Sequence, residues 1–344
     1  MKRLSAFASG RLIVTLSGKG DTDEEKAADI EARSAELFAD EENIISSYNG
    51  VFLIQYDSAE AAKEACERYS TLADIAEPDI GLAISDDEEV ESEDTEPEPE
   101  YIETDTVMTE EDNPLTVLND MISDDSETEP ESDSAEDPRY DIALIDTGAP
   151  ENDSVIKAVS MIGDSVEDDN GHAARMLDYI LTENSNATVL SIKALDSSGK
   201  GDISAVYAAM EYAISQNVRI INLSLSAYAT TENSVLAEAV KEAKEAGIIV
   251  IGAAGNYSSN AMYYVPGNIE GVLTAGSVSN DGTLIEMSNY GECVDYYIVS
   301  SSTSEAAARL SGWLSSHDIS EILTDVGAVT DGLIYTAIQE GGQN

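Results

Sequence analysis

Residues 138–336 predict a doubly wound α/β fold, in which helices cover both faces of a parallel sheet, and residues 10–84 predict a small α+β domain before it. Three observations support this. Short apolar strands alternate with amphipathic helices in the second half of the chain. The length of 344 residues suffices for two modest domains. A long acidic segment separates the two parts.

The N-terminal part alternates strand and helix patterns. Thr22 or Asp23 can cap its first helix and Ser58 its second. The second helix places small apolar residues on one face. We expect a split β-α-β domain of the ferredoxin-like kind. Its elements are a strand at 12–16, a helix at 23–38, a strong strand at 50–56, a helix at 58–69 and a weak strand near 72–76.

The segment at 85–137 is predicted to be a disordered acidic linker. Residues 86–137 hold 24 Asp or Glu and no Lys or Arg, so the segment repels itself and has little apolar surface to bury. A short apolar island, made of residues 107–108, 115–118 and 121–122, is the candidate for a helical contact. A calcium site is disfavoured because the carboxylates lack the loop spacing and turn glycine that such a site needs.

The C-terminal part has the alternation of a βαβ protein, in which active groups lie at the carboxyl ends of the strands. The expected strands are 141–145, 188–194, 218–225, 248–253 and 272–277. The expected helices are 173–182, 203–216, 233–246 and 303–314.

Composition excludes several functions. A net charge of -52 argues against binding nucleic-acid phosphates or an anionic membrane surface, and makes cationic partners plausible. Cys66 and Cys293 fall in different predicted domains, so no disulfide framework is expected. With two histidines and no Cys/His cluster we expect no metal and no cofactor. No apolar run is long enough to span a membrane, and the N-terminus lacks a signal-peptide pattern, so the chain reads as unexported.

Four side chains in the C-terminal part form a set that a serine hydrolase needs. Asp146 ends a predicted strand before Thr-Gly, and His172 opens a helix after Asn-Gly. Asn256 follows Gly-Ala-Ala-Gly, and Ser304 opens the last predicted helix. These residues supply an orienting acid, a general base, an oxyanion donor and a nucleophile. Each motif alone has a plainer explanation, as a turn aspartate, a surface histidine or a capping serine.

With these motifs in the order Asp, His, Asn, Ser, the chain from about 138 to about 316 resembles the subtilisin-like serine peptidases (subtilases). The resemblance implies a subtilisin-like fold and a serine endopeptidase that acts on peptide or protein substrates. It implies that Ser224, Leu225 and Ser226 line the substrate cleft and pair with the substrate backbone.

The N-terminal part is similar to the inhibitory propeptide of the same family. The matching pieces are 11–14, 48–52, the Ala-rich helix at 59–66 and Glu77-Pro78-Asp79. The resemblance implies that residues 10–84 act as an intramolecular chaperone and inhibitor whose tail, near 80–84, occupies the cleft. An unrelated ferredoxin-like binding domain is the alternative.

The chain departs from the family pattern at four places. Ser302 stands where the family has Gly, Glu305 where Met is usual and Ala308 where Pro is usual, while Ala173-Ala174 replace Gly-Thr. Glu305 adds a negative charge beside the expected oxyanion site unless it pairs, for instance with Arg309. A catalytically impaired peptide-binding protein and an esterase therefore remain alternatives. Loops that bind calcium in some relatives are missing.

Overall fold

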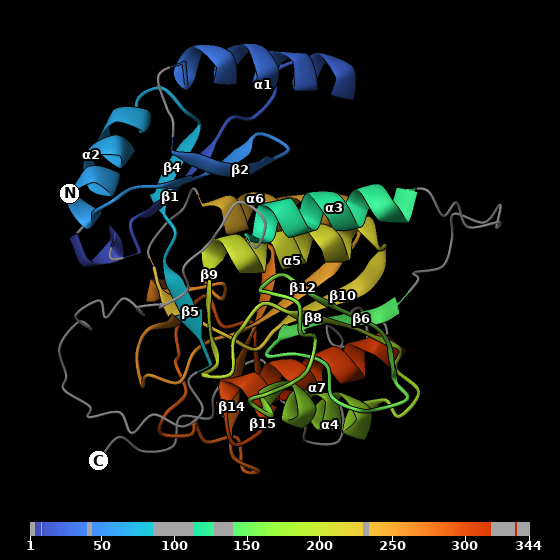
Figure 1. Ribbon diagram of the computed structural model, residues 1–344. Coiled ribbons are helices and arrows are strands. Elements are labelled where there is room, and N and C mark those ends of the chain that lie inside the picture. The colour runs from blue at the N-terminus through green and yellow to red at the C-terminus, as the bar shows by residue number, and fades with distance from the viewer. Residues whose placement is uncertain are drawn as a thin grey trace.

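The computed structural model describes residues 4–7, 9–39, 43–84, 113–126, 140–229, 234–317 and 334–335. Two sheets organise these residues, a small antiparallel sheet near the N-terminus and a large, mainly parallel sheet after it. Figure 1 shows the small sheet above two helices that cover the large one.

The N-terminal domain is the expected ferredoxin-like arrangement. Its antiparallel sheet has the order β2-β3-β1-β4. The elements, after a short 3-10 helix at Leu4–Phe7, are β1 (Arg11–Thr15), α1 (Asp23–Leu37), β2 (Ile44–Tyr48), β3 (Val51–Gln55), α2 (Ala59–Tyr69) and β4 (Ile75–Pro78). The sequence did not predict β2, and the last strand lies later than expected, because Leu72 is 57% exposed in the turn before it.

Local signals start and turn these elements. Thr22 forms a reciprocal capping box with Glu25 at the start of α1, and the Ser58 hydroxyl accepts from the Ala61 N–H at the start of α2. Asn49 and Gly50 both have positive φ, 44° and 83°, between β2 and β3. This is the backbone that a tight hairpin turn requires.

The C-terminal domain contains the predicted sheet. Its order is β16-β15-β14-β12-β10-β6-β8-β7, and neighbours run parallel except β15 and β16. The strands are β6 (Tyr140–Asp146), β7 (Val155–Ser160), β8 (Val189–Lys193), β10 (Val218–Leu223), β12 (Ile249–Ala253), β14 (Val272–Val278), β15 (Tyr296–Val299) and β16 (Ile334–Tyr335). The order reverses at β6, so the carboxyl ends around β6 and β10 form the switch point where such folds place their sites.

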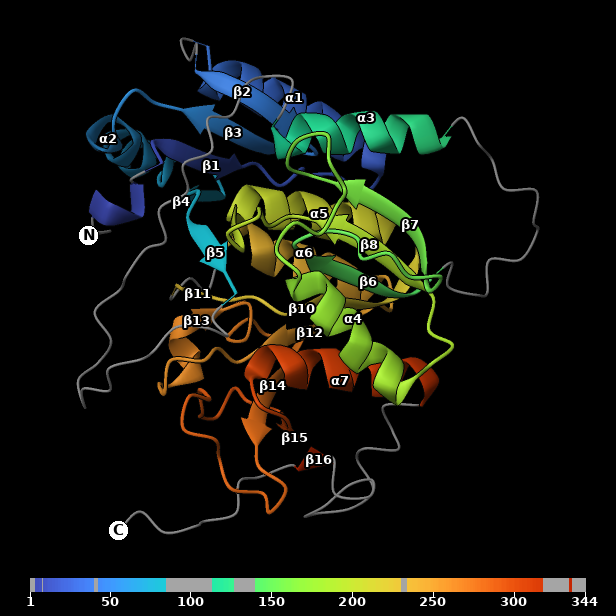
Figure 2. The ribbon, with the colours of Figure 1, turned by 60° about the horizontal axis from the view of Figure 1, so that its bottom comes forward.

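Helices cover both faces of this sheet, as a doubly wound fold requires (Figures 1 and 2). On one face lie α5 (Ile203–Ser215) and α6 (Val235–Glu245), and on the other lie α4 (His172–Glu183) and α7 (Thr303–Ser316). Residues Ile203 to Ala213 of α5 are all buried, because the sheet lies below this helix and the N-terminal domain above it. The fold class predicted from the sequence is confirmed.

The prediction of a disordered linker at 85–137 is wrong for residues 113–126. Helix α3 (Pro114–Ser126) forms there and packs against α5 and β2. Asn113 caps it, since its Oδ1 accepts from the Thr116 N–H, and Leu115 and Leu118 are buried. The apolar island therefore folds on its neighbours. Residues 85–112 and 127–139 lie outside the described residues.

Carboxylates of the N-terminal domain contact the starts of the two covering helices. Glu77 accepts from the Val235 N–H (2.7 Å) at the start of α6. Asp79 accepts from the N–H (2.9 Å) and the hydroxyl (2.8 Å) of Ser204 in α5. Helix N-termini carry unpaired N–H groups and partial positive charge, so these contacts stabilise both helices and the domain interface.

A buried ion pair lies beside these contacts. The Arg11 guanidinium is 3.0 Å from Asp79 and 2.6 Å from Asp202, and its side chain is 2% exposed. Burial alone lowers the pKa of Arg11, but the two carboxylates outweigh that effect and raise the pKa above its ordinary value. Because Asp202 belongs to the C-terminal domain, the pair joins the two domains.

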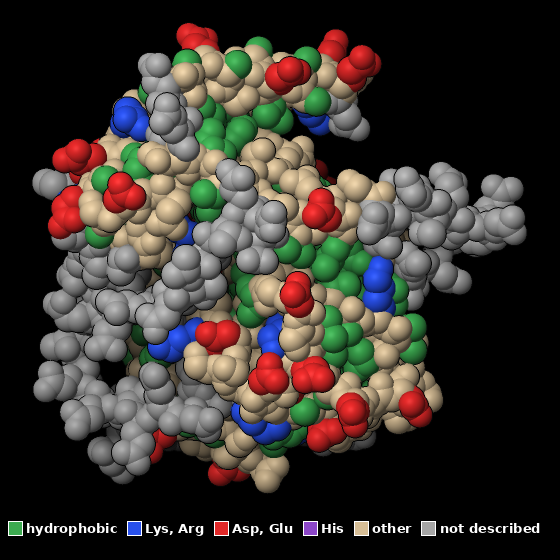
Figure 3. Space-filling view, viewed as in Figure 1, with side chains coloured by type: hydrophobic (Ala, Val, Ile, Leu, Met, Phe, Trp, Pro, Cys, Tyr) green, Lys and Arg blue, Asp and Glu red, His purple; other side chains and the backbone are tan. Residues whose placement is uncertain are grey.

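The surface carries the acidic character of the composition. Figure 3 shows Asp and Glu side chains over α1 and α2 and across the lower part of the same face. Within the part of the chain that the structure describes, no helix combines the length and apolar character needed to cross a bilayer.

Candidate active site

Asp146 and His172 contact each other at the switch point of the large sheet. Asp146 is the last residue of β6, and His172 is the first residue of α4. Nδ1 of His172 is 2.8 Å from Oδ1 and 2.9 Å from Oδ2 of Asp146, and both side chains are buried. A carboxylate only accepts hydrogen bonds, so this contact places the imidazole proton on Nδ1 and the lone pair on Nε2.

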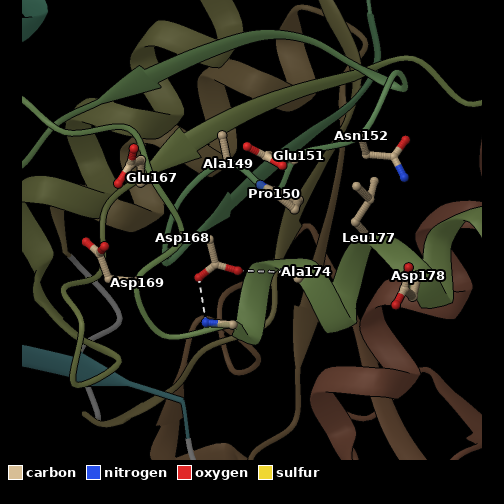
Figure 4. A pocket seen from close by; sticks show the side chains of 11 residues that line it. Ala149, Pro150, Glu151, Asn152, Glu167, Asp168, Asp169, Ala174, Leu177 and Asp178 are labelled. Carbon is tan, nitrogen blue, oxygen red and sulfur yellow. Dashed lines mark hydrogen bonds between the residues drawn. The ribbon is translucent and has the colours of Figure 1, made fainter.

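The start of α4 is held by side chains that the sequence analysis did not single out. Asp168 accepts from the Gly171 N–H (2.8 Å) and the Ala174 N–H (2.8 Å). Figure 4 shows this carboxylate pointing at the first turn of the helix. The Thr147 hydroxyl accepts from the Ala173 N–H and donates to Asp168. His172 therefore sits on a rigid helix end, and the Asp-rich loop before Asn-Gly-His was the available sequence signal for this cap.

Asn256 is oriented by Thr303. Its Oδ1 accepts from both the N–H (2.9 Å) and the hydroxyl (2.9 Å) of Thr303. A backbone N–H can only donate, so the oxygen of the amide must face Thr303 and Nδ2 faces the other way. The Thr303 hydroxyl also accepts from the Gly255 N–H. Thr303, which the sequence analysis treated as a motif match only, thus positions the amide donor.

Ser304 lies in the first turn of α7, next to Thr303. Its hydroxyl is 3.4 Å from the carbonyl of Ser224, at the end of β10. Ser302 is the N-cap of the helix, and its hydroxyl accepts from the Glu305 N–H (3.2 Å) with an extended backbone (φ −149°). The serine that replaces the family's glycine therefore serves as a helix cap, in a conformation that any residue adopts.

The Glu305 carboxylate lies at the start of its own helix, where Ser301 and Arg309 hold it. Oε2 accepts from the N–H (3.0 Å) and the hydroxyl (2.6 Å) of Ser301, and Oε1 lies 3.8 Å from the Arg309 guanidinium. Arg309 also contacts Glu183 at 2.7 Å. The expected pairing of Glu305 with Arg309 is present, so its charge is partly compensated.

The segment Ser224–Ser226, which follows β10, can offer only backbone groups to a neighbouring strand, because all three side chains are buried. The hydroxyl of Ser224 lies 2.9 Å from Asn222 Oδ1 and 3.1 Å from the Ser304 carbonyl, inside the domain. The N–H and carbonyl of Ser226 both pair with Ala83. Backbone groups are what β-strand addition uses.

A short strand that the sequence did not predict, β9 (Lys200–Asp202), lies on the other side of the tail of the N-terminal domain. It pairs antiparallel with β5 (Gly81–Ala83), the tail of the N-terminal domain. The Ile84 N–H donates to the Gly199 carbonyl (3.1 Å). Residues 81–84 therefore lie as a central strand between β9 and Ser226, and the side chain of Leu82 is buried.

Two glycines permit close packing around β9, Gly199 against the tail and Gly201 against Ala194 of its own domain. A Cβ on Gly199, whose φ is +75°, would lie 2.6 Å from the Ile84 side chain, and a Cβ on Gly201 would lie 2.2 Å from the Ala194 carbonyl. Neither position has room for a side chain. The Gly-Lys-Gly sequence was the local sign of this strand, since glycine within a strand often marks close backbone approach.

A pocket of about 560 Å³ lies on the outer side of the α4 start. Figure 4 shows five acidic side chains around it, and its lining includes Leu177 but not Ser304, Asn256 or residues 224–226. The acidic lining residues are Glu151, Glu167, Asp168, Asp169 and Asp178. Asp168 caps α4, and Asp169 pairs with Lys193 at 3.0 Å. Among the described residues, no group of three or more His, Cys, Asp or Glu is arranged to hold a metal ion.

The comparisons with known proteins agree on one family. A model described as "Subtilase family" matches residues 139–315, and on this match the chain belongs to the subtilase family of serine peptidases. Thermitase of Thermoactinomyces vulgaris is 31% identical over 202 residues, which are 52% of this chain and 71% of thermitase.

Two further relatives match a smaller share. A thermostable alkaline protease of Halalkalibacterium halodurans is 32% identical over 163 residues, 44% of each chain. A thermophilic serine proteinase of a Bacillus species is 33% identical over 194 residues, 50% of this chain and 48% of that protein. This chain therefore spans less than half the length of these two relatives. A solved cold-adapted subtilisin-like serine proteinase aligns with a TM-score of 0.47 and 21% identity, over 55% of this chain and 79% of that one.

Proposed function

We propose that the protein is a serine endopeptidase in which Ser304 attacks a peptide carbonyl. The observation that carries the proposal is the buried contact between Asp146 and His172 Nδ1. With the proton on Nδ1, the lone pair of Nε2 can take the proton from the Ser304 hydroxyl, and the same nitrogen later gives it to the leaving amine. Asp146 stabilises the imidazolium that forms between these two steps.

Asn256 Nδ2 and the Ser304 N–H would bind the oxyanion of the tetrahedral intermediate. The support is that the amide oxygen accepts from Thr303, so the end of the amide turned away from Thr303 is the donor end, Nδ2. The Ser304 N–H lies at the start of α7, where the helix dipole favours negative charge. The Ser302 cap and the Ser301 and Arg309 contacts of Glu305 accommodate two of the family departures.

The N-terminal domain would act as an intramolecular inhibitor. Its tail forms the central strand between β9 and Ser226, the place that the backbone of an extended substrate would take. Peptide or protein substrates would have to displace this tail. The same domain, through Glu77 and Asp79, would assist the folding of α5 and α6.

Labelling with a fluorophosphonate probe tests the proposal, because the probe reacts with activated serines. We expect a covalent adduct on the unaltered protein and none on Ser304→Ala. Ser316→Ala, at the far end of the same helix, is the matched control and should label normally. Cleavage of a protein substrate, detected as new N-termini, separates an endopeptidase from an esterase.

Two results would count against the proposal. Equal labelling of Ser304→Ala and Ser316→Ala would place the reactive group elsewhere. Peptide binding without any labelling, even after the N-terminal domain is removed, would favour the impaired peptide-binding protein. Cleavage of the chain by its own active site is a separate expectation, and mass spectrometry that finds only the intact chain after long incubation would contradict it.

A further inference from the structure

Helix α3 contacts both domains at once. It packs against α5 of the C-terminal domain and against β2, an edge strand of the N-terminal sheet. Both ribbon views show it lying along α5 on the side of the small sheet (Figures 1 and 2). The function proposed above assigns no role to this helix.

The contact with α5 is apolar. Leu115 and Leu118 are 1% and 0% exposed and belong to the same core cluster as the helix beneath them. Ile122 continues this face at the spacing of an amphipathic helix and is partly buried in the cluster. The helix carries no basic residue and is flanked by acidic sequence, so this apolar face is what fixes it in place.

The contact with β2 is polar and follows the period of a strand. The side-chain amide of Asn119 donates to the Ser47 carbonyl (2.8 Å), and that of Asn113 donates to the Ile45 carbonyl (3.4 Å). Between them, the hydroxyls of Ser46 and Thr116 lie 3.0 Å apart. Alternate carbonyls of an edge strand point away from the sheet, and α3 supplies donors to two successive ones.

A cut in the chain on either side of α3 would turn one of its two contacts into a contact between fragments. Residue 84 lies in the cleft, and α3 begins at residue 114, so a cut between them would leave α3 joined to the C-terminal domain. The hydrogen bonds to β2 would then run between two separate fragments. A cut after residue 126 would leave α3 with the N-terminal fragment, and its apolar contact with α5 would bridge the fragments instead.

We propose that α3 is a bridging helix that keeps the N-terminal domain bound to the C-terminal domain after the chain between them is cut. It would thereby slow the release of the inhibitor and the opening of the cleft. The regulatory role of α3 rests on the proposed function. The bridging itself is a binding property, and it is tested without measuring activity.

The test uses the full chain with Ser304→Ala, so that the protein cannot cut itself. The recognition sequence of a specific protease replaces residues 96–102, the protein is cut there, and the complex is immobilised through its C-terminus. Loss of mass from the surface then reports release of the N-terminal fragment. The measurement is made at a urea concentration at which release from the otherwise unaltered complex can be followed.

We expect Leu115→Ser with Leu118→Ser to speed release about ten- to a hundredfold, because α3 loses the apolar contact that fixes it on α5 and then no longer holds β2 in place. Asn119→Ala should speed it about three- to tenfold, because one hydrogen bond to β2 is lost at an exposed position that does not affect folding. Asp120→Ala, exposed on the same helix, is the matched control and should release at the unaltered rate.

Equal release rates for Asn119→Ala, the double variant and Asp120→Ala would overturn the inference. That result differs from failure of the proposed function, which is an absence of labelling at Ser304. Circular dichroism of the double variant checks that the domains remain folded, and Asn119→Ala keeps the inference falsifiable if they do not.

Discussion

Ala83 and Ser226 exchange two backbone hydrogen bonds, of 3.1 Å and 3.0 Å, although they are far apart in the chain. One belongs to the tail of the N-terminal domain and the other follows β10 in the C-terminal domain. With β9 on its other side, the tail is paired at both edges. A strand held on both sides occupies the backbone partners that, in the proposed function, an extended substrate would use.

The buried ion pair at the domain interface should matter far more than an exposed one. Arg11→Met leaves Asp79 and Asp202 without their buried cation, and we expect a loss of about 3–5 kcal/mol in the free energy of unfolding. Arg33→Met removes a partly exposed pair with Asp74 and should cost no more than about 1 kcal/mol. Urea unfolding of both variants checks this, and similar losses would contradict the role of Arg11 at the interface.

Thr303 positions Asn256 through its N–H and its hydroxyl. Asn256→Ala should lower kcat about a hundredfold to a thousandfold, because an oxyanion donor is lost. Thr303→Val keeps the N–H that donates to Asn256 but removes the hydroxyl, so we expect a fall in kcat of about tenfold with little change in KM. Steady-state kinetics on a peptide substrate measures both, and an unchanged kcat in Asn256→Ala would contradict the oxyanion assignment.

Glu211 is a buried carboxylate on α5, 5% exposed, and its Oε1 has no hydrogen-bond partner among the residues that the structure describes. Burial, and then the charge of Glu242, raise its pKa from 4.5 to about 8. Burial, and then the charges of Glu211 and Glu242, raise the pKa of Tyr207 on α5 and of Tyr48 on β2. The charge of Glu238 on α6 also raises the pKa of Tyr207. The positive charge of Lys26 lowers the pKa of Glu242.

A raised carboxyl pKa makes the folded protein less stable as the pH rises. Between about pH 4.5 and pH 8 the folded state keeps a proton on Glu211 that the unfolded state has lost, so stability falls as pH rises, by up to about 1.4 kcal/mol per pH unit. Glu211→Gln should remove this slope and raise stability near pH 8. Thermal unfolding across this range, with the exposed Glu270→Gln as control, checks it; parallel curves for the unaltered protein and Glu211→Gln would contradict it.

The net charge of -52 should make stability depend on salt. Like charges repel one another more in the compact state than in the unfolded chain, and salt screens that repulsion. We expect the melting temperature to rise as NaCl increases from about 0.01 M to about 1 M. Calorimetry measures this, and a melting temperature that falls over the same range would contradict it.

Motif chemistry predicted much of the candidate site from the sequence. Asp146 and His172 were chosen because each ends or begins an element at the same edge of a parallel sheet, and the structure brings them together. Asn256 contacts Thr303, which precedes Ser304 in the chain. The strands and helices of the C-terminal domain are long and periodic, so local pattern sufficed for them.

The missing parts are those that only tertiary contacts create. Strands β5 and β9 have three residues each and form by pairing with each other across more than a hundred positions. Helix α3 is acidic and short, and it is stabilised by burial of Leu115 and Leu118 on α5. The apolar residues of α3 indicated a helical contact, but local sequence does not identify the partner elsewhere in the chain that each of these elements needs, so their place in the fold could not be predicted from pattern alone.

The rate and the site of fluorophosphonate attack test most directly whether Ser304 is the nucleophile and whether the N-terminal tail blocks it. Leu82→Asp should displace the tail from the cleft, while Leu72→Asp makes the same change at an exposed position of the same domain. We predict an adduct on Ser304 in every protein, forming at least about tenfold faster in Leu82→Asp than in the unaltered chain or in Leu72→Asp. An adduct on another residue would contradict the assignment of Ser304 as the nucleophile. Equal rates in the three proteins would contradict inhibition by the tail.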